Sequence, residues 1–246
     1  MNKGKFIYSL VYLTILFSLS GCSAAIGIKA CPDRSSSIEL SMSMGDALAD
    51  TLQSMLSMNG DSSTDGVFSA ASMEKVKLAF EGGDFTDVAL SSPSASSLLL
   101  SGRIKPAEEQ RVLSGSNIKV ANLITCTSSS LTVILSPEII SQLAAALPEE
   151  SSSYLGLFMA PVFTGEAMSA EEYRELISAV YGEELARELD KSSLRITLEP
   201  PDDKKIQQAS LSGTERARTS GEKASFSIPL IEFFTLSSPR TFSISW

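Results

Sequence analysis

The sequence predicts an α+β fold in which a mainly antiparallel sheet carries a central helical segment packed on it. Two observations support this class: segments with alternating apolar side chains cluster toward both ends of the chain, and segments with helical spacing lie between them. Strict alternation of strands and helices is absent, which disfavours a doubly wound parallel sheet. The 246 residues predict one domain, and an apolar content of 43% is enough for a normal core.

The first part of the domain predicts two strands, a helical region and a hairpin. Segment 38–44 alternates Ile, Leu and Met with Glu and Ser, which is typical of a half-buried strand. Segments 47–58 and 73–80 place apolar side chains at helical spacing. Segments 85–90 and 98–105 read as two strands joined through a Ser-Pro-Ser turn, so we expect a hairpin.

The middle of the chain predicts two more strands and two helices. Segments 118–127 and 131–135 are expected to be strands, and Ser136-Pro137 then starts a helix that runs to about residue 147. A capping box, Ser169-Ala-Glu-Glu172, opens the next helix. Gly182 interrupts that helix, and apolar residues at Leu185 and Leu189 continue it.

The C-terminal part predicts three strands separated by a long polar loop. Segment 194–198 alternates cleanly and ends at Pro200-Pro201. The polar loop that follows reaches to segment 224–230, which is expected to be a strand, as is segment 242–246.

The N-terminus has the features of a secretory signal. Lys3 and Lys5 form a short basic start, and residues 6–19 are mostly apolar. This run is shorter than the roughly 20 residues that span a bilayer as a helix. It ends in Leu19-Ser20-Gly21-Cys22.

Leu19-Ser20-Gly21-Cys22 resembles the lipobox of bacterial lipoproteins: an aliphatic residue, two small residues and an obligatory cysteine. The resemblance implies cleavage between Gly21 and Cys22, a thioether lipid on Cys22 and an acyl chain on its amine. The protein would then be held in the cell envelope, at the cell membrane or the outer membrane. The alternative is an ordinary signal peptide that happens to contain a cysteine.

This interpretation divides the chain into three parts. Residues 1–21 are a signal peptide that is removed, residues 22–37 are a lipidated N-terminus and Ser-rich tether, and residues 38–246 are one α+β domain. Removing the signal takes away Lys3 and Lys5 and no acid, so the formal net charge goes from −9 to −11. Such a chain repels polyanions, and we expect no nucleic-acid partner.

The cysteines and histidines limit the chemistry further. Cys31 and Cys126 remain after Cys22 is assigned to the lipid, and in an exported protein they are a possible disulfide pair, or else two free thiols. The sequence has no histidine, which excludes His-dependent triads and nearly every zinc site. Asp61–Gly66 begins like a calcium loop, but its twelfth position is Ser72, so no metal or cofactor is expected.

Segment 154–163 is the most apolar stretch after the signal. One interpretation is that this segment is buried in the core. The other is that it forms an apolar surface for a hydrophobic ligand. The residues that would line this surface are Tyr154, Leu157, Phe158 and Phe163.

From Leu194 onward, a strand ended by Pro, a polar loop, an apolar strand and a final strand with Trp246 resemble small envelope lipoproteins of the LppM type. No function is transferred from this resemblance. The preferred interpretation is a non-enzymatic binding or assembly module on a membrane, and the alternative is a carrier of a lipid or other hydrophobic ligand. A hydrolase built on Ser72 and Lys75 or on Ser220 and Lys223 is a weaker alternative, since the further partners of a Ser–Lys enzyme are missing.

Overall fold

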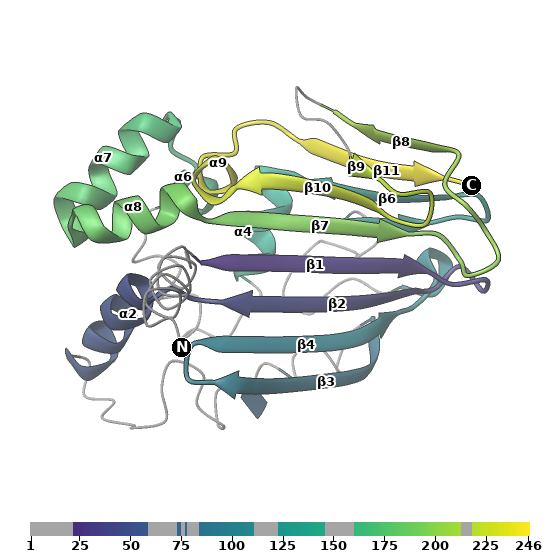
Figure 1. Cartoon of the computed structure of the whole chain (residues 1–246), viewed down its shortest axis with the longest axis horizontal. Coiled ribbons are helices and arrows are strands. Elements are labelled where there is room, and N and C mark those ends of the chain that lie inside the picture. The colour runs from purple at the N-terminus through teal and green to yellow at the C-terminus, as the bar shows by residue number, and fades with distance from the viewer. Residues whose placement is uncertain are drawn as a thin grey trace, which may run out of the picture.

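The computed structural model describes residues 22–58, 73, 74, 77, 84–110, 123–145, 160–212 and 218–246. These residues form two β-sheets with helices gathered mainly at one end (Figure 1). Both helices and antiparallel-dominated sheets are present, so the α+β prediction is confirmed.

The larger sheet has seven strands in the order β3-β4-β2-β1-β7-β10-β9, so that β1 lies in the middle. β1 pairs antiparallel with β2 on one side and parallel with β7 on the other, and the other pairings among the described strands are antiparallel. The strands of this sheet are β1 (Ser23–Ala30), β2 (Ser36–Ser43), β3 (Phe85–Ser94), β4 (Ser97–Ile104), β7 (Ser193–Glu199), β9 (Arg218–Thr219) and β10 (Ala224–Pro229).

The smaller sheet has four strands in the order β5-β6-β11-β8. They are β5 (Ile124–Cys126), β6 (Ser130–Leu135), β8 (Gln208–Leu211) and β11 (Arg240–Ser245). Its buried side chains belong to the same core as those of β7 and β10. Phe226 of β10 and Phe242 of β11 meet edge to face, with ring centroids 5.2 Å apart, and so join the two sheets.

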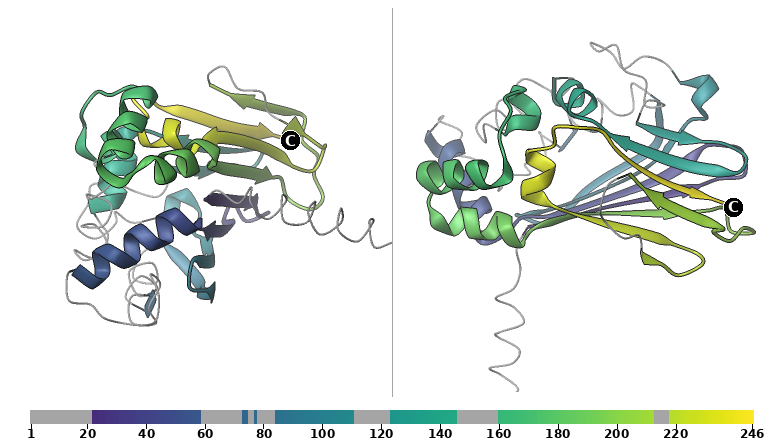
Figure 2. Two further views of the ribbon diagram at one scale, coloured as in Figure 1. Left: turned by 60° about the vertical axis from the view of Figure 1, so that its left-hand side comes forward. Right: turned by 90° about the horizontal axis from the view of Figure 1, so that it is seen from above.

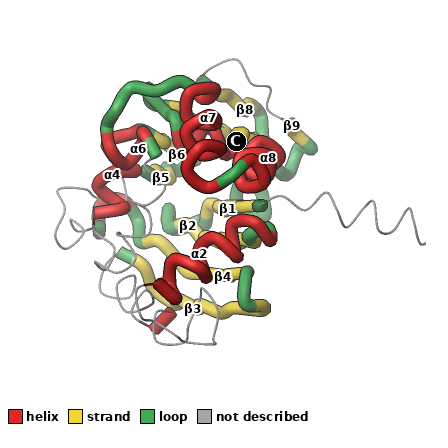
Figure 3. Tube along the Cα trace, turned by 90° about the vertical axis from the view of Figure 1, so that its left-hand side faces the viewer, coloured by secondary structure: helices red, strands yellow, loops and turns green. Residues whose placement is uncertain are grey.

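The helices are α2 (Asp46–Met58), α4 (Pro137–Ala145), α6 (Pro161–Thr164), α7 (Ala170–Tyr181), α8 (Glu183–Lys191) and α9 (Leu230–Phe234). α2, α7 and α8 lie beyond the end of the large sheet at which β1 begins (Figures 1 and 2). Seen from that end, they stand in front of the strands (Figure 3). Tyr173 of α7 and Phe234 of α9 pack edge to face, which ties these helices to the core.

The start of α7 confirms the predicted capping box. The Glu172 N–H donates to the Ser169 hydroxyl at 3.2 Å, and the Ser169 N–H donates to the Glu172 carboxylate at 2.8 Å. Gly182 has φ +97°, a value that favours glycine, and it separates α7 from α8.

The prediction that residues 22–37 form a tether is wrong. Residues 23–30 are the middle strand of the large sheet, and residues 36 and 37 begin β2, so the folded domain starts at the N-terminal end of β1 rather than at residue 38. Ala24, Ile26 and Ile28 alternate with smaller or polar residues, and they pack into the core from one face of β1. The small residues that alternate with them, Ser23, Ala25 and Gly27, made the segment look like a linker, although its period of two is that of a strand.

Two further expectations are wrong: a polar loop without strands before residue 224, and a single sheet. β8 and β9 lie inside that loop, and β8 pairs with β11 to complete the smaller sheet. β8 is short and only half-buried or exposed, so its sequence has little apolar alternation to reveal it. Segment 73–80 and the segment of the calcium-like loop lie almost entirely outside the described residues.

Candidate lipid-attachment site

Cys22 directly precedes β1, at the end of the large sheet where α2 and α8 lie (Figure 1). Its side chain is buried, with an exposed fraction of 7%. The thiol donates a hydrogen bond to Oε1 of Glu188 at 3.1 Å and accepts one from the Gly45 N–H at 3.4 Å. The predicted anchor residue is therefore part of the packed structure in this unmodified chain, next to a carboxylate from α8.

Glu188 links three elements at this position. Its carboxylate accepts hydrogen bonds from the Ala47 N–H at 3.0 Å and the Leu48 N–H at 3.2 Å, the second and third residues of α2. These are N–H groups that a helix leaves without an internal partner, and an N-cap side chain normally satisfies them. Gly45 stands at the N-cap position without a side chain, so Glu188 supplies the cap from a distant part of the chain.

Gly45 is needed for this contact because of space. A Cβ atom at Gly45 would overlap the carboxylate of Glu188. A residue with a side chain at this position would therefore push Glu188 away from the first turn of α2.

The environment makes the Cys22 thiol a poor nucleophile in the folded chain. Its pKa is raised from 9.0 to about 12, mainly by burial; the hydrogen bond and negative charge of Glu188 act in the same direction, and the Gly45 N–H opposes them. The thiol is protonated at neutral pH, and since the thiolate is the reactive form, the folded chain holds Cys22 unreactive.

Gly21, the other residue of the predicted cleavage site, lies outside the described residues. Glu188 was not singled out from the sequence. The only signal in the sequence is its place near the C-terminal end of α8, where a carboxylate is unfavourable for the helix dipole and so needs another partner.

The structure brings the other two cysteines close together. All three cysteines are unbonded. Cys31 follows the last residue of β1, and Cys126 is the last residue of β5. The thiol of Cys126 lies beside the Ser36 hydroxyl and the backbone N–H of Cys31.

The predicted ligand surface is described only at one end. Tyr154, Leu157 and Phe158 lie outside the described residues. Phe163 belongs to α6, is half-buried and packs on Phe234 with ring centroids 6.3 Å apart. This residue is thus part of the packing around the core.

Ser220 and Lys223 do not form a Ser–Lys pair. The Ser220 hydroxyl is directed to the carbonyl oxygen of Lys223, at 3.5 Å, and not to its amine. The Lys223 amine is paired with Glu199 at 2.7 Å, which raises the pKa of the amine and keeps it protonated. A protonated amine cannot take a proton from a serine. Ser72 and Lys75 lie outside the described residues.

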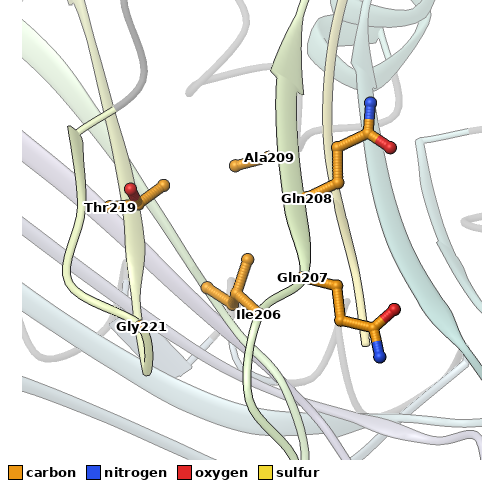
Figure 4. A pocket seen from close by; sticks show the side chains of 6 residues that line it. All are labelled: Ile206, Gln207, Gln208, Ala209, Thr219 and Gly221. Carbon is orange, nitrogen blue, oxygen red and sulfur yellow. The ribbon is translucent and has the colours of Figure 1, made fainter.

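A surface hollow of about 390 Å³ lies between the start of β8 and β9 (Figure 4). Its lining is formed by Ile206, Gln207, Gln208, Ala209, Thr219 and Gly221. These side chains include no acid, base or thiol, so the hollow offers hydrogen bonds but no group for acid–base or nucleophilic chemistry.

Two features are absent from the residues that the structure describes. These residues contain no group of three or more Cys, Asp or Glu side chains placed to hold a metal ion. Within the same ranges, no helix combines the length and hydropathy needed to cross a membrane.

Comparison with known proteins does not assign a family. No protein-family model matches the chain, and neither does any curated protein. Among solved structures, the chain is similar to part of an aminopeptidase N family protein from Idiomarina loihiensis, with a TM-score of 0.34 and 5% identity over 90% of this chain. The match covers 29% of that protein's length, and the similarity is too weak to transfer a fold or an activity.

Proposed function

We propose that this protein is a bacterial envelope lipoprotein: it is exported, cut before Cys22 and held to a membrane by lipid on that cysteine. The observation that carries the proposal is the Leu19-Ser20-Gly21-Cys22 motif at the end of a basic and apolar leader. The position of Cys22 supports it, because the folded domain begins at the next residue and would be intact after cleavage. Two or three acyl chains, at about 0.8 kcal/mol per buried CH₂, would hold the protein without help from its body.

The state of the Cys22 thiol gives the proposal an order of events. The buried, protonated thiol of the folded chain cannot act as a nucleophile. Lipid transfer to Cys22 would therefore precede folding of the domain. The lipidated sulfur can no longer donate to Glu188, but the carboxylate keeps its two partners in α2.

The short distance between the proposed anchor and the sheet supports an orientation in which this end of the domain faces the membrane. With β1 beginning at Ser23, no tether separates the lipid from the fold. The strands end here in serines, but α2, α7 and α8 beyond them carry acidic side chains such as Asp46, Glu171 and Glu183. The lipid, and not charge attraction, would therefore hold this end at the membrane.

We propose a non-enzymatic binding or assembly role for the domain. The outward face of β1, β2 and β7 is partly or fully open and presents mainly small and polar side chains, as expected for a surface that other envelope proteins could approach. Members of this face include Ala25, Gly27, Ser41, Ser43 and Thr197.

A second candidate function is the binding of a hydrophobic ligand. Leu40, Met42 and Leu98 lie on the opposite face of β2 and β4; they are half-buried and outside the main core. Ligand sites are lined mainly by apolar side chains, so these three residues are where a hydrophobic ligand would lie. Mass spectrometry of an organic extract of the purified Cys22→Ala protein tests this: a stoichiometric lipid or acyl compound supports it, and protein free of such compounds refutes it.

The anchor is tested by intact-mass analysis of the protein from the membrane fraction. We expect a polypeptide that starts at Cys22 with added diacylglyceryl and acyl mass, and we expect both to be lost in Cys22→Ala. Cys31→Ala is the matched control, because it removes a cysteine that the motif does not include and should leave the lipid in place. An unlipidated product in the soluble fraction, cut at another residue, would refute the proposal.

A further inference from the structure

Two cysteines that are far apart in the sequence meet between the two sheets. Cys31 follows β1 of the large sheet, and Cys126 ends β5 of the small sheet. The N–H of Cys31 and the hydroxyl of Ser36, the first residue of β2, lie against the thiol of Cys126. The backbone of Cys31 and the thiol of Cys126 are therefore neighbours, and a disulfide forms between cysteines whose Cα atoms lie within about 7 Å.

The loop that holds Cys31 is fixed by its own hydrogen bonds. The Cys31 N–H donates to the Ser35 carbonyl at 2.9 Å, and the Arg34 N–H donates to the Cys31 carbonyl at 3.0 Å. The Asp33 carboxylate accepts from the Ser35 hydroxyl at 2.6 Å and from Arg103 of β4 at 2.7 Å. The loop is therefore held to the sheet, and Cys31 stays near Cys126.

Cys126 lies on a short edge strand, which a covalent link to the large sheet would hold in place. β5 has three residues and is an edge strand that pairs only with β6 among the described strands. The Cys126 side chain is 8% exposed, and burial raises the pKa of its thiol. A disulfide is uncharged and apolar, so this buried position suits a half-cystine at least as well as a thiol.

We propose that Cys31 and Cys126 form a disulfide in the exported protein and so join the large sheet to the small one. This inference rests on the proposed export, because disulfides persist in oxidising compartments outside the cytoplasm. The electron acceptor is a protein or small-molecule disulfide of that compartment.

The reaction balances as two thiol–disulfide exchanges. The half-buried Cys31 loses its proton and attacks the acceptor, which forms a mixed disulfide and releases one acceptor thiol. Cys126 then loses its proton, attacks the Cys31 sulfur and releases the second acceptor thiol. Both electrons end on the acceptor, which becomes a dithiol, and the two cysteines become one cystine.

Peptide mapping without reduction tests the proposal on the full chain from the membrane fraction. Free thiols are first blocked by alkylation. We expect a cross-linked peptide pair that contains Cys31 and Cys126, with neither residue alkylated, and we expect both to be alkylated once the sample is reduced.

A second measurement separates the disulfide from the proposed export. The same protein is reduced, freed of reductant and exposed to oxidised glutathione while folded. If the bond forms in this sample but is absent in the sample from cells, the protein never met an oxidising compartment and the export proposal fails. If the bond forms in neither sample, the two sulfurs are not placed to react and the disulfide proposal is overturned.

The melting temperatures of the variants Cys31→Ser and Cys126→Ser show whether the two residues stabilise the protein through one shared bond. Each single variant breaks the same bond, so we expect each to lower the melting temperature and the double variant to lower it little further. Under reducing conditions the wild-type protein should fall to the level of the variants. Additive losses that reductant does not reproduce would overturn the proposal.

Discussion

Replacing Glu188 by Ala should loosen the start of α2. The carboxylate of Glu188 satisfies the N–H groups of Ala47 and Leu48 and contacts the Cys22 thiol. Gly45, which precedes α2 at the N-cap position, has no side chain that could replace it. The variant leaves two N–H groups of the first turn to water and removes a negative charge from the positive end of the helix dipole.

The size of the effect follows from these two losses. Removing a side-chain N-cap costs about 1 kcal/mol and up to about 2 kcal/mol. A charge at a helix end contributes about 0.3–1 kcal/mol. We expect Glu188→Ala to lower the free energy of unfolding by about 1.5–2.5 kcal/mol, or the melting temperature by about 3–10 °C for a chain of this size. Glu188→Gln retains an acceptor oxygen and should cost less than about 1 kcal/mol.

Thermal and urea unfolding, followed by circular dichroism, measure this change. All variants are made in a chain of residues 22–246 that carries Cys22→Ala, which lacks the leader and cannot be lipidated, so that they are compared in the same form. Glu184→Ala is the matched control, since Glu184 lies on α8 and its side chain is exposed. Its effect should stay within about 0.5 kcal/mol.

Gly45→Ala provides an independent test without changing Glu188. Its Cβ would displace the carboxylate, so the variant should lose the same cap. The double variant Gly45→Ala/Glu188→Ala should then lose less than the sum of the single losses. Full additivity, or a Glu188→Ala protein as stable as Glu184→Ala, would refute the role assigned to Glu188.

Three further predictions concern other parts of the molecule. Ile28→Ala should cost about 2–5 kcal/mol because Ile28 is buried in the middle strand; an unchanged melting temperature would mean that residues 23–30 are a tether after all. The Ser35 hydroxyl, together with the Ser35 N–H and Arg103, holds the pKa of Asp33 below its ordinary value of 3.8. The ionised Asp33 carboxylate therefore stabilises the fold above pH 3.8, and this stabilisation is lost as the pH falls through the lowered pKa of the folded state. Asp33→Asn should therefore be less stable than wild type at pH 7 and approach it in acid, and parallel stability curves from pH 7 to acid would contradict this. Trp246 lies at the end of the sheets away from the start of β1 (Figure 1), and β1 alone spans about 26 Å. Brominated lipid should therefore leave the fluorescence of Trp246 unchanged in the lipidated protein, but should quench that of a Trp246→Phe/Ala95→Trp variant, whose tryptophan lies in the β3–β4 turn. The reverse pattern would overturn the proposed orientation.

Local patterns in the sequence were sufficient for most elements of the fold. Alternation of apolar residues identified β2 and β7, and the Ser169–Glu172 box identified the start of α7. These features depend on side chains within one turn or one strand, so the sequence contains all the information needed. The same holds for the lipobox-like motif Leu19-Ser20-Gly21-Cys22, which is a pattern of four neighbouring residues.

Other elements depend on what their neighbours supply. β1 consists mainly of small side chains and gains its stability from two flanking strands, and β8 forms because β11 offers an edge to pair with. Sequence patterns that are weak by themselves become strands when pairing satisfies their backbone groups. This is why residues 23–30 looked like a tether and residues 208–211 like a loop.

By itself, the sequence determined the α+β class, the acidic charge and the absence of histidine, and it contains the lipobox-like motif on which the proposed anchor depends. Only the tertiary structure decided that Glu188 caps α2 beside Cys22 and that Cys31 lies against Cys126. Each of these contacts joins residues about 95 to 165 positions apart. Such contacts follow from how sheets and helices pack against one another, and no periodicity or spacing along the chain encodes them.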